Sequence, residues 1–240
     1  MRLFPIVALT LCLSFAGPVE AENTTTARFD VRTNGFRFGA LEAIYSIQGN
    51  RYTVDIRADA QGFLGLLLRS HYQGSSRGIL DANGNMISQL FTAHSRRIFK
   101  DRLQTVSFRD SLPTKVDIIP ESEKTDMSDP VLVTDKRRDP LSFFAEFVQD
   151  RNSGCAGPAD LYDGRRMVRV TLQQRNTKDG HLRCEGVYRI VKGPDHSIQS
   201  GHRTFGLRLD YRFLENKTSR LKWITFTSGR NEVILERLAQ

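Results

Sequence analysis

Apolar and polar side chains alternate along most of this chain. The clearest run extends from Phe205 to Leu214, and every second residue up to Phe213 is apolar. Successive side chains of a β-strand point to opposite faces of a sheet, so the pattern predicts strands with one buried and one solvated face. Similar runs recur between residues 29 and 108 and between residues 167 and 238. We expect eight to eleven strands in all.

Short polar turns connect these runs. Gly49-Asn50 and residues 81–84 (Asp-Ala-Asn-Gly) each separate two alternating segments, as in β-hairpins. After Gly62, the apolar run 63–68 is too short to cross a bilayer. We expect it to form a buried turn or short helix that plugs one end of the sheet. Residues 120–138 are polar and irregular.

One stretch has helical periodicity instead. Asp139-Pro140 is a typical helix start, because aspartate accepts from free N–H groups and proline suits the first helical position. Apolar residues then recur at helical spacing at Leu141, Phe144, Phe147 and Val148. The sequence therefore predicts a mainly β fold. In it, one strongly curved antiparallel sheet, an open barrel or a β-spiral, wraps around a single short helix near residues 140–151.

The amino terminus has the features of a secretory leader. Arg2 precedes an apolar run, and Val19-Glu20-Ala21 supplies small residues at the positions that signal peptidase requires. We expect residues 1–21 to be cleaved and residues 22–240 to form a single β domain in the periplasm.

Cleavage would also settle the cysteine pairing. It removes Cys12 and leaves Cys155 and Cys184 as the two remaining cysteines. An even pair in an exported protein indicates a disulfide. In the chain-entropy model, closing a loop of this length contributes roughly 3–4 kcal/mol of stability.

The formal net charge is +8. Arginines of the predicted strands, such as Arg165, Arg189 and Arg208, fall singly along the chain, as on a solvated sheet face. Only Arg96-Arg97 and residues 136–138 form compact basic runs. We therefore expect no nucleic-acid binding. In an exported protein, a basic surface either serves solubility alone or meets an anionic membrane surface or acidic glycans.

The stretch Gly74-Ser75-Ser76-Arg77-Gly78 has the letters of a nucleophile elbow. An elbow needs a buried strand before the serine and a helix after it, whereas these flanks predict polar strand residues and a hairpin. A cryptic serine hydrolase would use Ser75 or Ser76 with a histidine such as His71, and it requires these groups to converge. No two histidines have metal-ligand spacing, so neither a metal nor a cofactor is expected.

Several of these motifs together resemble a proteobacterial family of exported proteins of unknown function (DUF 3108). The residues that carry the resemblance are Gly62 to Tyr72, Asp139-Pro140-Leu141, Cys155-Ala156-Gly157, Tyr162-Asp163-Gly164-Arg165-Arg166 and Cys184. More distantly, the predicted architecture and disulfide are similar to alphaproteobacterial envelope-integrity proteins that form a β-spiral, an open sheet curled around a helix. Both resemblances imply a fold and a compartment, and neither implies catalytic residues.

The sequence thus predicts a non-catalytic periplasmic protein of the cell envelope. It would bind a lipid or acyl chain, a lipoprotein or another envelope protein, and support envelope integrity. A ligand-free structural interaction module is a further alternative. Because one helix covers only part of a curled sheet, we expect any ligand groove on the concave side, with a completely filled core as the competing outcome. The predicted lining of this groove is Phe143, Phe147, Leu209, Tyr211 and Trp223.

Overall fold

A computed structural model gives the fold of the chain. It describes residues 23–61, 70–150, 154–176, 181–195, 201–215 and 218–239. The expected leader, residues 1–21, and the expected plug, residues 63–68, lie outside the described residues. Within the described part of the chain, no helix is both long enough and apolar enough to span a bilayer.

The described residues contain thirteen strands, all in one antiparallel sheet. The first half of the chain supplies β1 (Asn23–Thr33), β2 (Phe36–Gln48), β3 (Arg51–Ala60), β4 (His71–Leu80), β5 (Met86–Arg97), β6 (Lys100–Arg109) and β7 (Leu112–Ile119). The second half supplies β8 (Ala159–Tyr162), β9 (Met167–Asn176), β10 (Leu182–Lys192), β11 (Thr204–Phe213), β12 (Ser219–Ser228) and β13 (Asn231–Arg237). The predicted mainly β fold, with one curved antiparallel sheet and one short helix, is confirmed.

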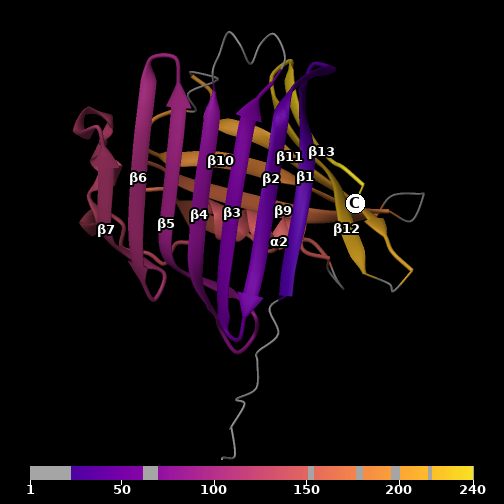
Figure 1. The fold of residues 1–240 in the computed structure, drawn as a ribbon, viewed down its shortest axis with the longest axis horizontal. Helices are drawn as coiled ribbons and strands as arrows, with labels where there is room; N and C mark the ends of the chain where they lie inside the picture. Colours follow the sequence, from indigo (N-terminus) through magenta and orange to yellow (C-terminus); the bar gives the residue numbers. More distant parts are fainter. Residues whose placement is uncertain are drawn as a thin grey trace, which may run out of the picture.

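Each half of the chain is a meander, in which every strand pairs with its neighbours in sequence. The two halves join where the first strand pairs with the last, with Phe29 opposite Arg237 and Val31 opposite Leu235. β7 and β8 are therefore the two edges, and the sheet stays open. In Figure 1, β2 to β6 run up and down the view and β9 to β11 cross behind them. The curled sheet thus forms two layers.

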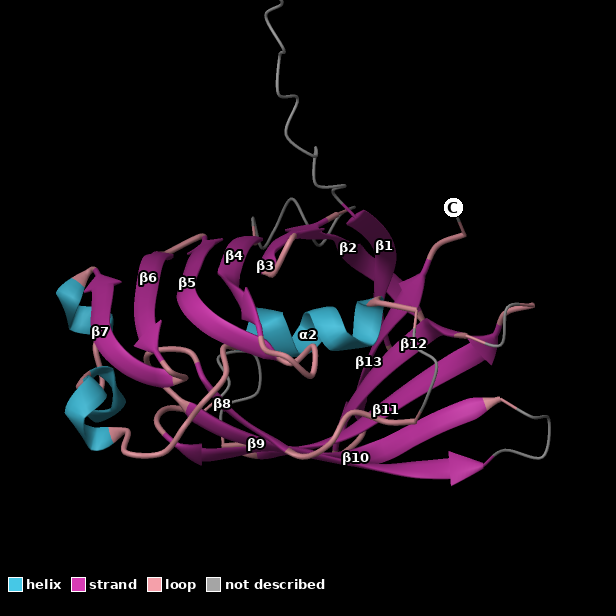
Figure 2. Cartoon of the chain, turned by 90° about the horizontal axis from the view of Figure 1, so that it is seen from below, coloured by secondary structure: helices cyan, strands magenta, loops and turns pink. Residues whose placement is uncertain are grey.

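The helix α2 (Pro140–Val148) lies between these two layers, as Figure 2 shows. Its buried residues are Leu141, Ser142, Phe143, Ala145, Phe147 and Val148. The helix ends three residues before the expected position, because Gln149 has an extended backbone (φ −69°, ψ 144°). Arg237 of β13 donates a hydrogen bond from Nη1 to the carbonyl of Val148 at 2.9 Å. This bond satisfies one of the carbonyls that a helix end leaves free.

Residues 120–138 connect the two edges of the open sheet. They carry three short 3₁₀ turns, η1 (Glu121–Glu123), η2 (Asp126–Ser128) and η3 (Pro130–Leu132). The Tyr162 hydroxyl of β8 donates to the carbonyl of Met127 at 2.5 Å. The N–H of Arg137 donates to the carbonyl of Ser111, in the β6–β7 turn, at 2.7 Å. The polar segment therefore holds both edge strands, which explains why a stretch without strand periodicity is ordered.

The sequence pattern predicted neither edge strand. β7 contains Pro113, which cannot donate a ladder hydrogen bond and is tolerated at the edge of a sheet. β8 has four residues, too few for a clear alternation. Both strands are recognisable only from their pairing with β6 and β9.

Candidate functional site

Cys155 and Cys184 form the predicted disulfide, with their Cα atoms 5.6 Å apart. Cys184 is fully buried on the inner face of β10, whereas Cys155 is half-buried in the segment that follows α2. The bond therefore ties the chain beyond the helix to the second layer of strands. Since disulfides persist in oxidising compartments, it accords with an exported protein.

Four of the five predicted groove residues are core residues. The side chains of Phe143, Phe147, Leu209 and Tyr211 are between 0 and 5% exposed. The rings of Phe143 and Phe147 pack edge to face, with their centroids 4.8 Å apart. At these four positions the structure has a filled core rather than an open groove.

Trp223 lies on the other face of the sheet, which corrects its predicted place in the groove. β12 contains a bulge at Lys222, because Leu221 pairs with Tyr211 while Trp223 pairs with Asp210. The extra residue shifts the alternation, and Trp223 faces outward with Asp210. The Nζ of Lys222 lies 3.9 Å from the centroid of the Trp223 ring. A regular alternation through β12 would have placed this ring in the core.

The serines of the Gly74–Gly78 stretch point to opposite faces of β4. Ser76 is fully buried and donates a hydrogen bond to Oδ2 of Asp139 at 2.8 Å. Ser75 lies on the outer face with His71, four residues along the strand, a separation of about 13 Å. The ring of His71 is hydrogen-bonded to Asp59. The structure thus brings neither serine to His71, the pairing that a serine hydrolase would require.

Ser75 does share a hollow with another histidine. It is an outer-face hollow of about 330 Å³, and its lining includes Ser75, Asp55 and His94. The Nε2 of His94 lies 2.5 Å from Oδ1 of Asp101. Within the described residues, no hydrogen bond joins Ser75 to His94. The hollow therefore lacks the serine–histidine contact that would activate a nucleophile.

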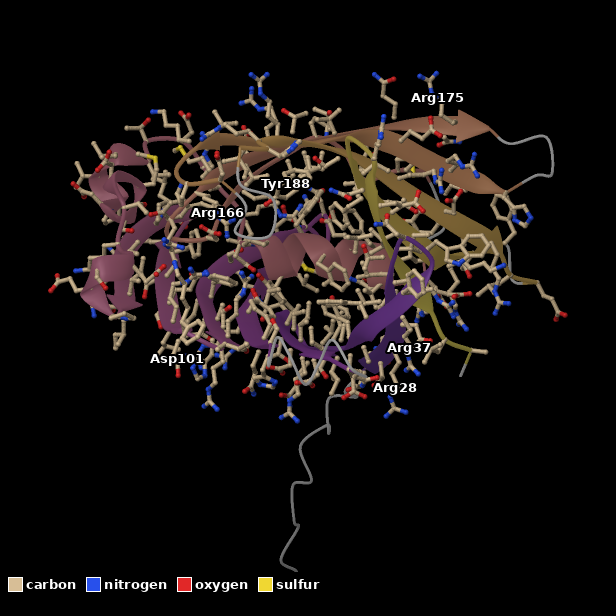
Figure 3. All side chains as sticks on the ribbon, turned by 90° about the horizontal axis from the view of Figure 1, so that it is seen from above. Arg28, Arg37, Asp101, Arg166, Arg175 and Tyr188 are labelled. Atoms are coloured by element: carbon tan, nitrogen blue, oxygen red, sulfur yellow. A yellow bond between two sulfur atoms is a disulfide. The ribbon has the colours of Figure 1, made fainter. Side chains whose placement is uncertain are left out.

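Four arginines converge where the β5–β6 hairpin meets the β8–β9 turn. They are Arg97 on β5, Arg102 on β6, and Arg165 and Arg166 in the turn, and we call them the arginine cluster. Figure 3 shows Arg166 and Tyr188 between the two layers of strands. The sequence pattern suggested isolated arginines on a solvated face. For Arg165 the structure corrects this interpretation, since it places this residue in a turn between the layers.

Asp163 holds the two arginines of the turn. Its Oδ1 accepts hydrogen bonds from the backbone N–H groups of Arg165 (2.9 Å) and Arg166 (2.7 Å). Its Oδ2 accepts from the Nε of Arg166 at 3.0 Å, and the charge of Asp163 raises the pKa of that arginine. Gly164 has a φ of +88°, and a Cβ atom there would lie 2.8 Å from Val106 of β6. Glycine therefore lets the turn lie directly against the first layer.

Glu123 of η1 forms ion pairs with Arg102 and Arg165. Its Oε2 lies 3.2 Å from Nη1 of Arg102 and 3.1 Å from Nη2 of Arg165. The Nε of Arg165 also donates to the backbone carbonyl of Glu123 at 2.7 Å. Burial disfavours the charged form of Glu123, but the hydrogen bond from Arg102 and the charges of Arg165 and Lys100 lower its pKa overall.

The arginine cluster carries more positive than negative charge. The side chain of Arg97 makes no ion pair or hydrogen bond within the described chain. Burial lowers the pKa of Arg97, and the charges of Arg102 and Arg166 lower it further. The Nε of Arg102 and the Oε1 of Gln104 are buried without a hydrogen-bond partner among the described residues. Among the described residues, four guanidinium groups and the ammonium group of Lys100 thus share two carboxylates, those of Glu123 and Asp163. An added anion would stabilise this excess of positive charge.

Aromatic side chains lie beside the cluster. Burial raises the pKa of Tyr188 to about 12 and also raises that of Tyr72, while the charge of Arg166 lowers both. The Tyr188 ring packs edge-on against Phe205 and Phe226, with centroids 5.9 and 6.3 Å away. The cluster is therefore bordered by a wall that is apolar apart from its hydroxyl groups.

Planar guanidinium groups donate paired hydrogen bonds to phosphate or carboxylate oxygens, so the arginine cluster is suited to an anionic group. The sequence carried one signal for it, the predicted turn at Asp163-Gly164, but no signal that this turn meets β5 and β6.

In the part of the chain that the structure describes, no group of three or more His, Cys, Asp or Glu side chains is placed to bind a metal ion. Comparisons of the chain with protein-family models, with curated proteins and with solved structures found no match.

Proposed function

We propose that this protein is a non-catalytic periplasmic protein of the cell envelope that binds an anionic lipid headgroup at the arginine cluster. The observation that carries the proposal is the unequal charge of the cluster, in which Arg97 lacks a carboxylate partner in the described chain. A phosphate group would fit between such guanidinium groups and accept several charge-assisted hydrogen bonds. The aromatic wall at Tyr188 would contact the glycerol and first methylene groups of the lipid.

The compartment is part of the same proposal. The disulfide between Cys155 and Cys184 supports export, as does the expected leader at residues 1–21. The resemblance to the exported family DUF 3108 points the same way, and the Tyr162–Arg166 stretch that contributes to it also supplies half of the arginine cluster. Membership of that family is proposed on these grounds.

Titration calorimetry with soluble short-chain phosphatidylglycerol tests the binding. Arg97→Gln should weaken binding about tenfold, because a hydrogen bond between charged groups contributes about 1.5–3 kcal/mol. Arg96→Gln is the matched control, since it removes the same charge from the neighbouring residue on the outer face of β5. We expect the Arg96→Gln variant to bind as the unchanged protein does.

Two further ligands identify the group that is recognised. Short-chain phosphatidylcholine should bind weakly, because its headgroup is zwitterionic. Inorganic phosphate, if it binds as tightly as phosphatidylglycerol, would indicate a phosphate site rather than a lipid site. Equal binding losses in the Arg97 and Arg96 variants, or no binding of any of these anions, would overturn the proposal.

The envelope role requires a cellular test. Cells that lack the gene should become more sensitive to detergent, and a plasmid copy should restore resistance. A copy with Arg97→Gln should restore less resistance than one with Arg96→Gln. Unchanged sensitivity of the deletion strain under detergent and cell-wall antibiotics would count against a role in envelope integrity.

A further inference from the structure

The β5–β6 hairpin ends in two exposed apolar residues. Arg97 pairs with Lys100, so Ile98 and Phe99 form a two-residue turn. Their exposed fractions are 47% for Ile98 and 94% for Phe99. Single exposed apolar residues are common on protein surfaces, so the surroundings of the turn decide what these two mean.

Basic residues surround this apolar tip. Residues 96–102 contain four cations, Arg96, Arg97, Lys100 and Arg102, and one carboxylate, Asp101. The side chain of Lys100 is 69% exposed, and its Nζ lies 3.4 Å from Oε1 of Glu123. The side chain of Arg96 is 60% exposed, and its Nε lies 3.6 Å from Oδ2 of Asp101. An apolar tip with cations at its base matches the boundary of an anionic bilayer, where acyl chains lie directly beneath negatively charged headgroups.

The β1–β2 turn, at the same end of the first layer, has a similar composition. Phe36 begins β2 beside the β1–β2 turn, is 74% exposed and is followed by Arg37. Figure 1 shows the β1–β2 and β5–β6 turns at the top of the view. The turns at the opposite end, residues 49–50, 81–85 and 110–111, contain no large apolar residue, and Leu112, which begins β7 beside the last of them, is 36% exposed. The apolar and basic turns are therefore gathered at one end of this layer.

We propose that the tip of the β5–β6 hairpin docks the protein onto an anionic bilayer surface. Ile98 and Phe99 enter the boundary between headgroups and acyl chains, and Lys100 contacts the anionic headgroups. Phe36 provides a second apolar contact. The inference goes beyond the proposed function and does not depend on it, because the tip faces solvent whether or not the arginine cluster holds a ligand.

Vesicle cosedimentation provides the first test. The chain from residue 22 onward contains every described strand and lacks the apolar run of the expected leader, which would itself bind vesicles. It should sediment with phosphatidylglycerol–phosphatidylcholine vesicles and not with phosphatidylcholine alone. Phe99→Ser should lower the partition coefficient about tenfold, and Lys100→Gln about fivefold. Phe213→Ser, at an exposed phenylalanine on the far end of β11, should leave it unchanged.

Fluorescence identifies the surface that enters the bilayer. The chain has one tryptophan, so Trp223→Phe gives a background without tryptophan fluorescence. In that background, Phe99→Trp should shift to shorter wavelength on anionic vesicles and be quenched by brominated lipid, whereas Phe213→Trp should do neither. An absence of vesicle binding overturns the inference. So does vesicle binding in which Phe99→Trp stays unquenched, or in which both tryptophans are quenched equally. Loss of lipid binding in Arg97→Gln with intact tip insertion would separate this inference from the proposed function.

Discussion

The hydroxyl of Ser88 donates a hydrogen bond to the fully buried carboxylate of Asp139, with 2.5 Å between Oγ and Oδ2. Ser76 donates to the same oxygen at 2.8 Å. The other oxygen of Asp139 accepts the N–H groups of Leu141 and Ser142. One aspartate therefore begins α2 and fixes the helix to β4 and β5 at the same time.

Ser88→Ala should lower the free energy of unfolding by about 2 kcal/mol, because it removes a hydrogen bond to the buried carboxyl group of Asp139. Denaturant titration measures the loss. Ser75→Ala is the matched control, since this serine faces outward on β4, and its effect should stay within about 0.5 kcal/mol. Equal losses for the two variants would show that the Ser88–Asp139 bond adds nothing to stability.

Cys155→Ser should lower the free energy of unfolding by roughly 3–4 kcal/mol, the chain-entropy value for the loop that the disulfide closes. Cys155 suits this test because Cys184 is fully buried, and a serine hydroxyl there would add its own desolvation cost. Reduction of the disulfide in the unchanged protein should lower its stability by a similar amount, as measured by thermal unfolding. The prediction is wrong if non-reducing peptide mapping of the protein finds these two cysteines unlinked.

Substitution of Arg166 should destabilise the protein, whereas substitution of Arg97 should not. Arg166→Gln should lower the free energy of unfolding by about 3 kcal/mol, because it leaves the carboxylate of Asp163 without its partner. Arg97→Gln should leave stability unchanged or raise it by up to about 1 kcal/mol, since it removes a cation that Arg102 and Arg166 repel. Urea titrations at low and high salt measure both effects. A large loss in the Arg97 variant would mean that Arg97 has a structural partner.

Stability should fall at alkaline pH. Burial raises the pKa of both Tyr45 and Tyr188 to about 12, above the usual value near 10. Because the folded protein binds these protons more tightly than the unfolded chain, the stabilising contribution is complete below pH ~10. It is lost as the pH rises from ~10 toward 12. In a pH titration, the tyrosinate absorbance of these residues should therefore appear at a higher pH than that of free tyrosine, until the protein unfolds. Normal titration of all tyrosines in the folded state would contradict this.

Trp223 should be accessible to quenchers in water. Iodide should quench its fluorescence efficiently, because the ring faces outward and the charge of Lys222 attracts the anion. Lys222→Gln should reduce quenching by iodide and leave quenching by neutral acrylamide unchanged. If neither iodide nor acrylamide quenches the fluorescence, Trp223 lies inside the core, as the alternating pattern predicted, and its outward position is wrong.

Local physics allowed much of the fold to be predicted. The alternation in β11 fixes which side chains are buried, because neighbouring residues of a strand must face opposite sides. Asp139 and Pro140 fix the start of α2 through interactions within one helical turn. The pairing of Cys155 with Cys184 needed only a count of the cysteines that remain after the expected cleavage.

Contacts between distant segments decided the rest. The outward position of Trp223 results from one extra residue in β12, which forms a bulge opposite β11. No local sequence pattern indicates this bulge. The arginine cluster exists because the sheet curls until the β8–β9 turn meets the β5–β6 hairpin, more than sixty residues earlier in the sequence. The sequence by itself determines which residues prefer a strand, a turn or a helix, since those preferences act over a few bonds. Which charged groups meet depends on the curvature and register of the whole sheet, and only the tertiary structure sets these.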